Sequence, residues 1–259
     1  MSDQRARRTR SEDQRTSPVL IAGFGVAAIV VFLAVLLVVR ALDSEEPPEV
    51  ALASRSPAAG GATASPEDAA TNDPTSFDGA WTIDAASGSL DDGTASFAGY
   101  RIEEELGGIG TNTAVGRTQL VQGTMTVAGT SVTDLDVTVD MASLRSDDER
   151  RDSQLASRGL ETARFPTATF ELAEPIILEG VPELGASIAT TAVGDLTLHG
   201  VTRRVDVPVD ARWTGEHIEV AASLDIALAD YDIEPPTGFL VLSIDDTGTI
   251  ELHLLFRRG

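Results

Sequence analysis

The sequence predicts an all-β protein in which a single antiparallel barrel of eight or nine strands follows one transmembrane helix and a disordered linker. After residue 79, short runs of alternating apolar and polar residues succeed one another, separated by turn-forming residues. Only residues 143–166 have helical character in this region, and they are too few for a helical domain. Because many one-sided strands leave exposed edges in an open sheet, we expect them to close into a barrel.

The N-terminal part predicts a membrane anchor. Residues 1–17 carry five arginines and no apolar periodicity, which indicates a disordered, cytoplasmic basic arm. Residues 18–40 predict a transmembrane helix, because Val19 to Val39 contains no charge and a bilayer core requires roughly 20 residues. The basic flank on the N-terminal side places that terminus in the cytoplasm and the rest of the chain outside it. We expect a single-pass protein of the cell membrane with an extracytoplasmic barrel.

A cleaved signal peptide is the competing interpretation of this segment. Ala51-Leu52-Ala53 has the small-x-small pattern of a cleavage site. The apolar stretch is longer than the 7–15 residues typical of signal peptides, and the Ala-x-Ala lies well beyond its end. These features favour an uncleaved signal-anchor.

Residues 41–78 are rich in Pro, Ala, Ser, Thr, Gly and acids, a composition typical of a disordered linker. A flexible chain of this length has an end-to-end reach of about 30–35 Å. The barrel domain is then expected to span residues 79–259.

The composition and net charge exclude some classes of binding partner. The net charge of −22 disfavours nucleic acid and anionic lipid surfaces, both of which require a basic patch. The chain has no cysteine, so no disulfide framework supports it. All of its basic residues are arginine, a usage that resembles proteins of GC-rich actinobacteria.

The strands are predicted from their alternation. In residues 134–141, Leu135, Val137, Val139 and Met141 share one face and acids or threonine occupy the other. The same pattern recurs at 218–228 and 250–256, and further strands are expected at 81–84, 96–106, 118–127 and 167–178.

A β-hairpin is predicted at Val193–Val209, with its turn at His199-Gly200. A loop of two residues (199–200) or four (199–202) puts Leu196 and Leu198 on the same side as the three valines at 205, 207 and 209. Those valines then face the small residues Gly194, Ala192 and Thr190. Small partners inside a barrel favour a slot for a thin apolar chain, although neighbouring side chains could fill the same space.

Residues 143–166 are polar, with apolar side chains at Leu155, Leu160 and Phe165. This spacing predicts one or two short helical turns over an end of the barrel, as a lid or a plug.

The candidate polar groups favour binding over catalysis. No nucleophile motif, phosphate-binding loop or metal-ligand spacing is present, so we predict neither an enzyme nor a metal site. His199 is interpreted as a turn residue, and the acidic runs 103–105 and 147–149 as solvated charge. Alternation sends Arg203 inward at the hairpin end, where we expect a structural role at the rim, with contact to a ligand head group as the alternative.

Three stretches of the sequence resemble a known family. They are Trp81-Thr-Ile-Asp84, Arg151-Asp152-Ser-Gln-Leu155 through Phe165-Pro166-Thr-Ala-Thr-Phe170, and Gly194-Asp-Leu-Thr-Leu-His-Gly-Val-Thr202. In order and spacing they are similar to the YceI-like family of polyisoprenoid-binding proteins, over about residues 80–258. The resemblance implies a lipocalin-like barrel, and it implies that Arg151 and Asp152 tie the helical segment onto that barrel.

The resemblance also implies a function. We expect the protein to bind a polyisoprenoid or similar long-chain lipid, an isoprenoid quinone being one candidate, in an apolar barrel cavity and with no other cofactor. A ligand-free barrel that acts as an interaction or stress-response module is the alternative. The side chains expected to line the cavity are Val137, Val139, Met141, Phe170, Leu172, Leu196, Leu198, Val205, Val207, Val209, Leu224, Ile226, Leu252 and Leu254.

Overall fold

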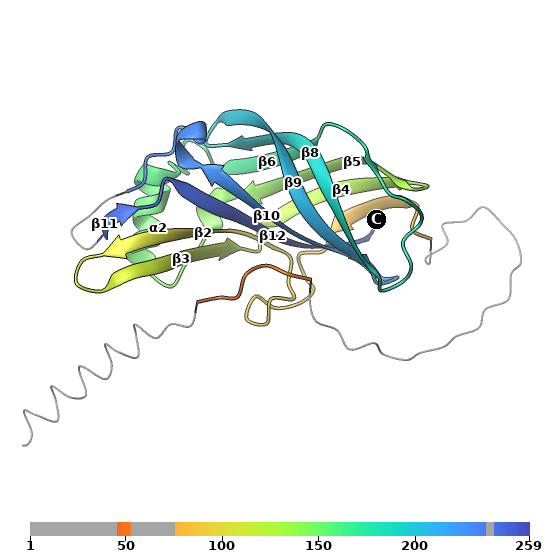
Figure 1. Cartoon of the computed structure of the whole chain (residues 1–259), viewed down its shortest axis with the longest axis horizontal. Helices are drawn as coiled ribbons and strands as arrows, with labels where there is room; N and C mark the ends of the chain where they lie inside the picture. The colour runs from red at the N-terminus through yellow and green to blue at the C-terminus, as the bar shows by residue number, and fades with distance from the viewer. Residues whose placement is uncertain (1–45, 53–75, 237–240) are drawn as a thin grey trace, which may run out of the picture. The chain divides into compact units, whose positions relative to one another are not determined.

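Eight antiparallel strands form a closed barrel in the computed structural model, which describes residues 46–52, 76–236 and 241–259 (Figure 1). Around the ring the order is β1, β4, β5, β6, β8, β9, β10 and β12, and β12 pairs back onto β1. These strands are β1 (Gly79–Ile83), β4 (Val121–Ala128), β5 (Ser131–Asp140), β6 (Thr167–Leu172), β8 (Ser187–Leu198), β9 (Val201–Trp213), β10 (His217–Ala227) and β12 (Thr247–Arg258). The predicted all-β barrel is confirmed.

A second hairpin pairs with the barrel along β12. It consists of β2 (Phe97–Leu106) and β3 (Gly110–Thr118), and β2 pairs with the first half of β12. The short strand β11 (Val241–Ile244) pairs with the other end of β2. Strand β3 was not expected, because the segment Gly110-Thr-Asn-Thr-Ala-Val-Gly116 has few large apolar residues and two glycines. The predicted strand at 118–127 therefore begins later, at Val121.

The predicted strand at 167–178 is interrupted. It divides into β6 and the two-residue β7 (Ile176–Ile177), both of which pair with β5. Pro175 separates them, and proline has no N–H with which to continue a ladder.

The predicted hairpin of β8 and β9 is confirmed with its two-residue loop. Leu198 pairs with Val201, and the backbone φ angles are 52° at His199 and 78° at Gly200. Positive φ at both positions is the signature of the tight turn that suits strand twist. The valines at 205, 207 and 209 lie opposite Gly194, Ala192 and Thr190, as expected.

Replacing Gly200 with alanine is expected to cost about 1–3 kcal/mol of stability, because L-residues adopt this φ reluctantly. A Cβ at this position would also lie 2.5 Å from Cε1 of Phe165, so the ring must move. Gly129→Ala is the matched control, since Gly129 has a φ of 61° but no atom within 4 Å of its Cβ. Urea unfolding should show the larger loss for Gly200→Ala; equal losses would mean that the Phe165 contact is unimportant.

The predicted helical turns cover one end of the barrel, where Figure 1 shows α2. Helix α2 (Glu149–Gln154) continues into a π-helical turn, η2 (Leu155–Gly159). Asp148 begins the helix, because its carboxylate accepts a hydrogen bond of 2.8 Å from the Arg150 N–H. Two short 3-10 helices, η1 (Met141–Ser143) and η3 (Leu228–Tyr231), follow β5 and β10.

Part of the predicted linker packs against the barrel. Arg101 pairs with Glu46 and donates to the Pro47 carbonyl at 2.8 Å, and Arg117 donates to the Pro48 carbonyl at 2.7 Å. Both arginines also contact Glu251, whose side chain is only 2% exposed. Residues 46–48 therefore contact β2 and β3, although they belong to the segment predicted as a disordered linker.

Asp84, which follows β1, organises the next turn. Its carboxylate accepts from the Ser87 hydroxyl at 2.6 Å and the Ala86 N–H at 3.0 Å, and it lies 3.3 Å from His217 Nε2. The Ser87 hydrogen bond, opposed by burial and reinforced by Ala86 and His217, lowers the pKa of Asp84 from 3.8 to about 2.

This shift predicts an acid-sensitive contribution to stability. A carboxyl with a depressed folded-state pKa stabilises the fold above its unfolded pKa and loses that effect as the pH falls through the folded value. Between pH 4 and 2, stability should fall more steeply in the wild type than in Asp84→Asn. Urea titrations across this window would show parallel curves if Asp84 made no contribution.

Candidate functional site

An apolar cavity of about 170 Å³ lies inside the barrel, at the end covered by α2 and η2. Leu155 and Leu160 from the helical segment form part of its wall, and Ala168 and Ala114 leave room within it. Eight of the predicted lining residues surround it: Val137, Val139, Met141, Phe170, Leu196, Leu198, Ile226 and Leu252. The alternation therefore identified this set of inward side chains correctly.

A smaller cavity of about 80 Å³ lies toward the opposite end of the barrel. Val209 and Leu254 line it, together with Phe77 and Trp213. Leu172, Val205, Val207 and Leu224 line neither space; each packs within the core of the barrel. Leu172 lies on β6, Val205 and Val207 on β9, and Leu224 on β10, and together they form a packed layer between the two cavities.

The small residues opposite the valines of β9 do not all leave empty space, which corrects the expectation of a slot there. A Cβ on Gly194 would lie 2.3 Å from Cζ of Phe170, so the phenyl ring already occupies the room opposite Val205. The alternation fixed which residues face each other, but it could not show which large neighbour leans across the sheet.

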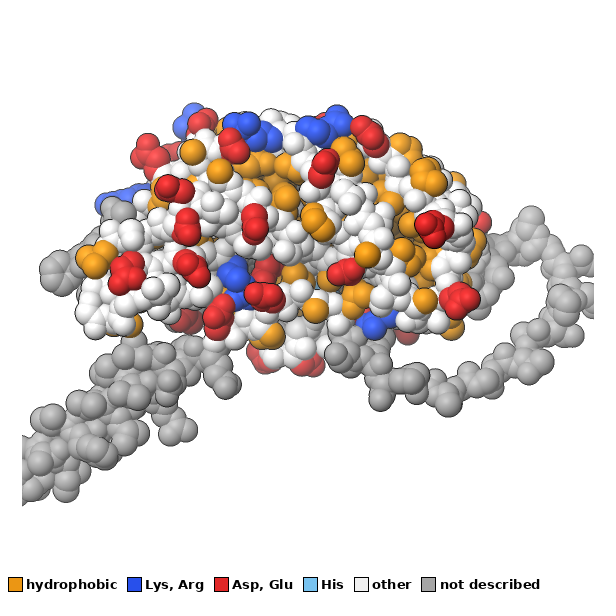
Figure 2. All heavy atoms as spheres, viewed as in Figure 1, with side chains coloured by type: hydrophobic (Ala, Val, Ile, Leu, Met, Phe, Trp, Pro, Cys, Tyr) orange, Lys and Arg blue, Asp and Glu red, His pale blue; other side chains and the backbone are white. Residues whose placement is uncertain are grey.

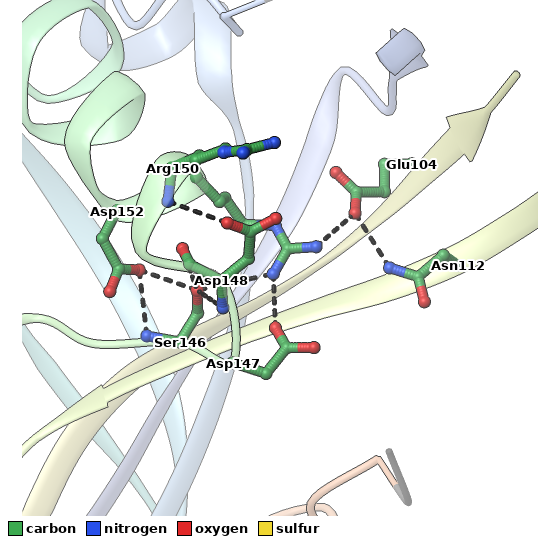
Figure 3. Close-up of polar contacts among 8 residues, drawn as sticks. Glu104, Asn112, Ser146, Asp147, Asp148, Arg150 and Asp152 are labelled. Carbon is green, nitrogen blue, oxygen red and sulfur yellow. Dashed lines mark hydrogen bonds and ion pairs between the residues drawn. The ribbon is translucent and has the colours of Figure 1, made fainter. Parts of the chain in front are cut away.

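Polar groups meet at the helix-covered end of the larger cavity (Figure 3). Arg151 Nη2 donates to Glu104 Oε1 at 2.7 Å, and its Nη1 lies 2.5 Å from Asp147 Oδ1. Asn112 donates a second hydrogen bond of 2.8 Å to Glu104. Asp152 instead accepts from the N–H and hydroxyl of Ser146, at 2.9 and 2.7 Å. Arg151 thus ties the helical segment to β2, as the resemblance implied, whereas Asp152 contacts Ser146 in the adjoining loop and no strand.

Glu104 corrects the interpretation of residues 103–105 as solvated charge. Its side chain is 3% exposed, because alternation along β2 turns it inward while Glu103 remains exposed. A run of three acids gives no hint of this, since an inward carboxylate is tolerated only when a distant residue such as Arg151 compensates it.

Tyr100 is a second wall residue that the sequence did not reveal. Its ring packs over Gly116, where a Cβ would lie 2.3 Å from Cε1, and its hydroxyl is buried without a hydrogen-bond partner among the described residues. Burial raises the pKa of Tyr100 to about 12, although the nearby Arg151 opposes the shift. The hydroxyl therefore keeps its proton and remains a donor at physiological pH.

Arg203 lies at the rim and not at the cavity. It shares its face with Leu196 but is close to the strand end, so its side chain is 48% exposed and pairs with Asp230 of η3 at 3.1 Å. Arg204 points away and pairs with Asp195 at 2.8 Å.

His199 has a structural role in its turn. Nδ1 lies 3.0 Å from the Tyr231 carbonyl and Nε2 lies 3.2 Å from Glu161, while the ring meets Phe165 edge-on at 4.4 Å. Within the described part of the chain, no three His, Cys, Asp or Glu side chains come together in an arrangement that would hold a metal.

Within residues 46–52, 76–236 and 241–259, no helix is long and apolar enough to cross a membrane. The predicted span at 18–40 lies outside these residues.

Comparison with solved structures finds the same barrel elsewhere. A polyisoprenoid binding domain from Saccharophagus degradans, implicated in plant cell wall breakdown, matches with a TM-score of 0.53 and 19% identity, over 69% of this chain and 98% of the other. BcnA from Burkholderia cenocepacia matches with a TM-score of 0.50 and 18% identity, over 67% of this chain and 98% of its own. At these identities the likeness establishes the fold.

No match was found among curated proteins. The family model of the YceI-like domain matches residues 73–256, which is most of the chain and the whole barrel except the last two residues of β12. The chain therefore belongs to the YceI-like family.

Proposed function

We propose that the barrel binds a long-chain isoprenoid lipid, such as a polyisoprenoid or an isoprenoid quinone, with part of its tail in the larger cavity. The observation that supports this proposal most directly is the cavity itself, an apolar space of about 170 Å³ inside a closed barrel. Packed protein cores contain few voids larger than a water molecule. The polyisoprenoid-binding domain with the same fold supports this class of ligand.

The size of the cavity limits how the tail enters. An apolar cavity of about 150 Å³ holds one benzene molecule, so this space accommodates a short segment of tail. A longer tail must displace the layer formed by Leu172, Val205, Val207 and Leu224, which would join the space to the smaller cavity. Each CH₂ removed from water contributes roughly 0.8 kcal/mol, which offsets part of this rearrangement.

We also propose that the N-terminal segment anchors the barrel to the outer side of the cytoplasmic membrane. The uncharged stretch at 18–40 and its basic flank support this topology. Only residues 41–45 separate the predicted span from Glu46, which is paired with Arg101 on the barrel. Five residues reach at most about 18 Å, so the barrel would stay close to its source of lipid.

Lipid analysis tests the first proposal. The full-length protein is purified from a bacterial membrane, extracted with organic solvent, and the extract is examined by mass spectrometry. An isoprenoid present in stoichiometric amount supports lipid binding, whereas its absence, together with no uptake of added isoprenoids, favours the ligand-free interaction module. Alkaline carbonate washing of membranes tests the anchor: the protein should remain in the pellet, and its release would contradict the proposed topology.

A further inference from the structure

The polar end of the larger cavity contains a donor without an acceptor. The Tyr100 hydroxyl is buried and unpaired among the described residues, and Tyr100 forms part of the cavity wall. An unpaired polar group in a low-dielectric environment loses its hydrogen bond to water and gains nothing in return. A ligand atom that accepts from this hydroxyl would restore the bond.

Both arginines that line this cavity are already paired with carboxylates: Arg101 contacts Glu46 and Glu251, and Arg151 lies at the polar end. Arg151 contacts Glu104 at 2.7 Å and Asp147 at 2.5 Å, and the helix beside it begins at Asp148 and carries Asp152 in its first turn. One guanidinium thus faces more than one carboxylate, which leaves the polar end with an excess of negative charge. An incoming phosphate would have to compete with Glu104 for Arg151 and would meet repulsion from the remaining acids.

The surrounding surface reinforces this preference. Acidic side chains are spread over the face of the barrel seen in Figure 2, and basic ones gather in a few places. The net charge of the chain is −22. A negatively charged head group is therefore disfavoured both on approach and at the site.

We propose that the Tyr100 hydroxyl donates a hydrogen bond to an uncharged oxygen at the polar end of the lipid, so that the cavity selects isoprenoids with a neutral carbonyl, such as quinones, over isoprenyl phosphates. This inference rests on the proposed lipid-binding function and specifies its ligand class. Selectivity against phosphates comes from the compensated arginine and its neighbouring carboxylates, while the tyrosine donor holds the carbonyl and the tail contributes affinity that both ligand classes share.

Two ligands with tails of the same length separate head-group selection from tail binding. Full-length protein is titrated with radiolabelled menaquinone-4 and geranylgeranyl diphosphate, and with phytane as a hydrocarbon probe. We expect menaquinone-4 to bind at least about tenfold more tightly than the diphosphate, the loss expected when one buried hydrogen bond is replaced by charge repulsion.

Tyr100→Phe tests the donor, and Tyr231→Phe is its matched control. Tyr231 also has a buried hydroxyl without a partner in the described chain, but it lines neither cavity. Tyr100→Phe should weaken menaquinone-4 binding about tenfold and leave phytane binding unchanged, whereas Tyr231→Phe should change neither. Because each variant removes an unpaired hydroxyl, neither should lose thermal stability.

The outcomes distinguish the inference from the function on which it rests. If the wild type binds the diphosphate as tightly as menaquinone-4, or if Tyr100→Phe has no effect on quinone binding, the inferred selectivity is wrong while lipid binding stands. If the wild type binds none of the three probes, the proposed function itself fails.

Discussion

Replacing Arg151 with methionine is expected to lower the free energy of unfolding by about 3 kcal/mol, the cost of leaving a buried charge without its partner. Methionine keeps much of the apolar stem of the arginine, so the loss reports on charge and hydrogen bonding. The Glu104 side chain is 3% exposed and would retain only the hydrogen bond from Asn112. Urea unfolding of the full-length protein measures the change.

A double-mutant cycle assigns this loss to the ion pair. Glu104→Gln preserves an acceptor for Asn112 and removes the buried charge, so Arg151→Met in that background should cost about 1 kcal/mol or less. Equal losses in the two backgrounds would show that Arg151 acts through packing of α2 and not through Glu104. If Arg151→Met alone lowered the free energy of unfolding only slightly, the Arg151–Glu104 pair would contribute no more than an exposed salt bridge.

The same pair illustrates why only part of the site could be predicted. Arg151 was identified through a motif that resembles a family, and its role in fixing the helical segment is confirmed. Its partner Glu104 lies 47 positions earlier, in a run of acids that looks solvated. Local alternation tells which side of a strand a residue occupies, but not which distant residue compensates a charge there.

The residues that line the cavity could be predicted from the sequence, but the volume of the cavity could not. Inward positions followed from alternation, and eight predicted residues surround the larger space. Val207 was expected beside a slot because Ala192 opposes it, yet it is 7% exposed and packed in the core. Free volume depends on the rotamers of neighbours such as Phe170, which pairing alone does not determine.

The β-hairpin at His199-Gly200 was predictable to the residue because register, turn type and side-chain pattern all agree there. Strand β3 was missed because its polar, glycine-containing sequence has no such agreement, and its pairing depends on β2. Tyr100 could not be identified from the sequence, because local alternation does not show that its hydroxyl is buried without a partner in the described chain.

Ala168→Phe is expected to abolish most lipid binding while the barrel stays folded. Ala168 is 8% exposed, faces Val139 across β5 and β6, and lines the larger cavity. The added phenyl ring is about the size of the benzene that a cavity of roughly 150 Å³ accommodates, so it fills the space without the usual cost of overpacking. Displacing about four methylene-sized groups of tail removes ~3 kcal/mol, equivalent to a roughly hundredfold loss of affinity.

Thr167→Phe is the matched control for this substitution. Thr167 is the neighbouring residue on β6 and is exposed, so its replacement by phenylalanine places the same ring on the outer face. Lipid recovered from the full-length variants by solvent extraction should be nearly absent in Ala168→Phe and unchanged in Thr167→Phe, with similar midpoints of thermal unfolding. Full retention of lipid in a folded Ala168→Phe would mean that the tail binds elsewhere. The cavity would then be a packing defect, because a tail that occupied it could not coexist with the ring.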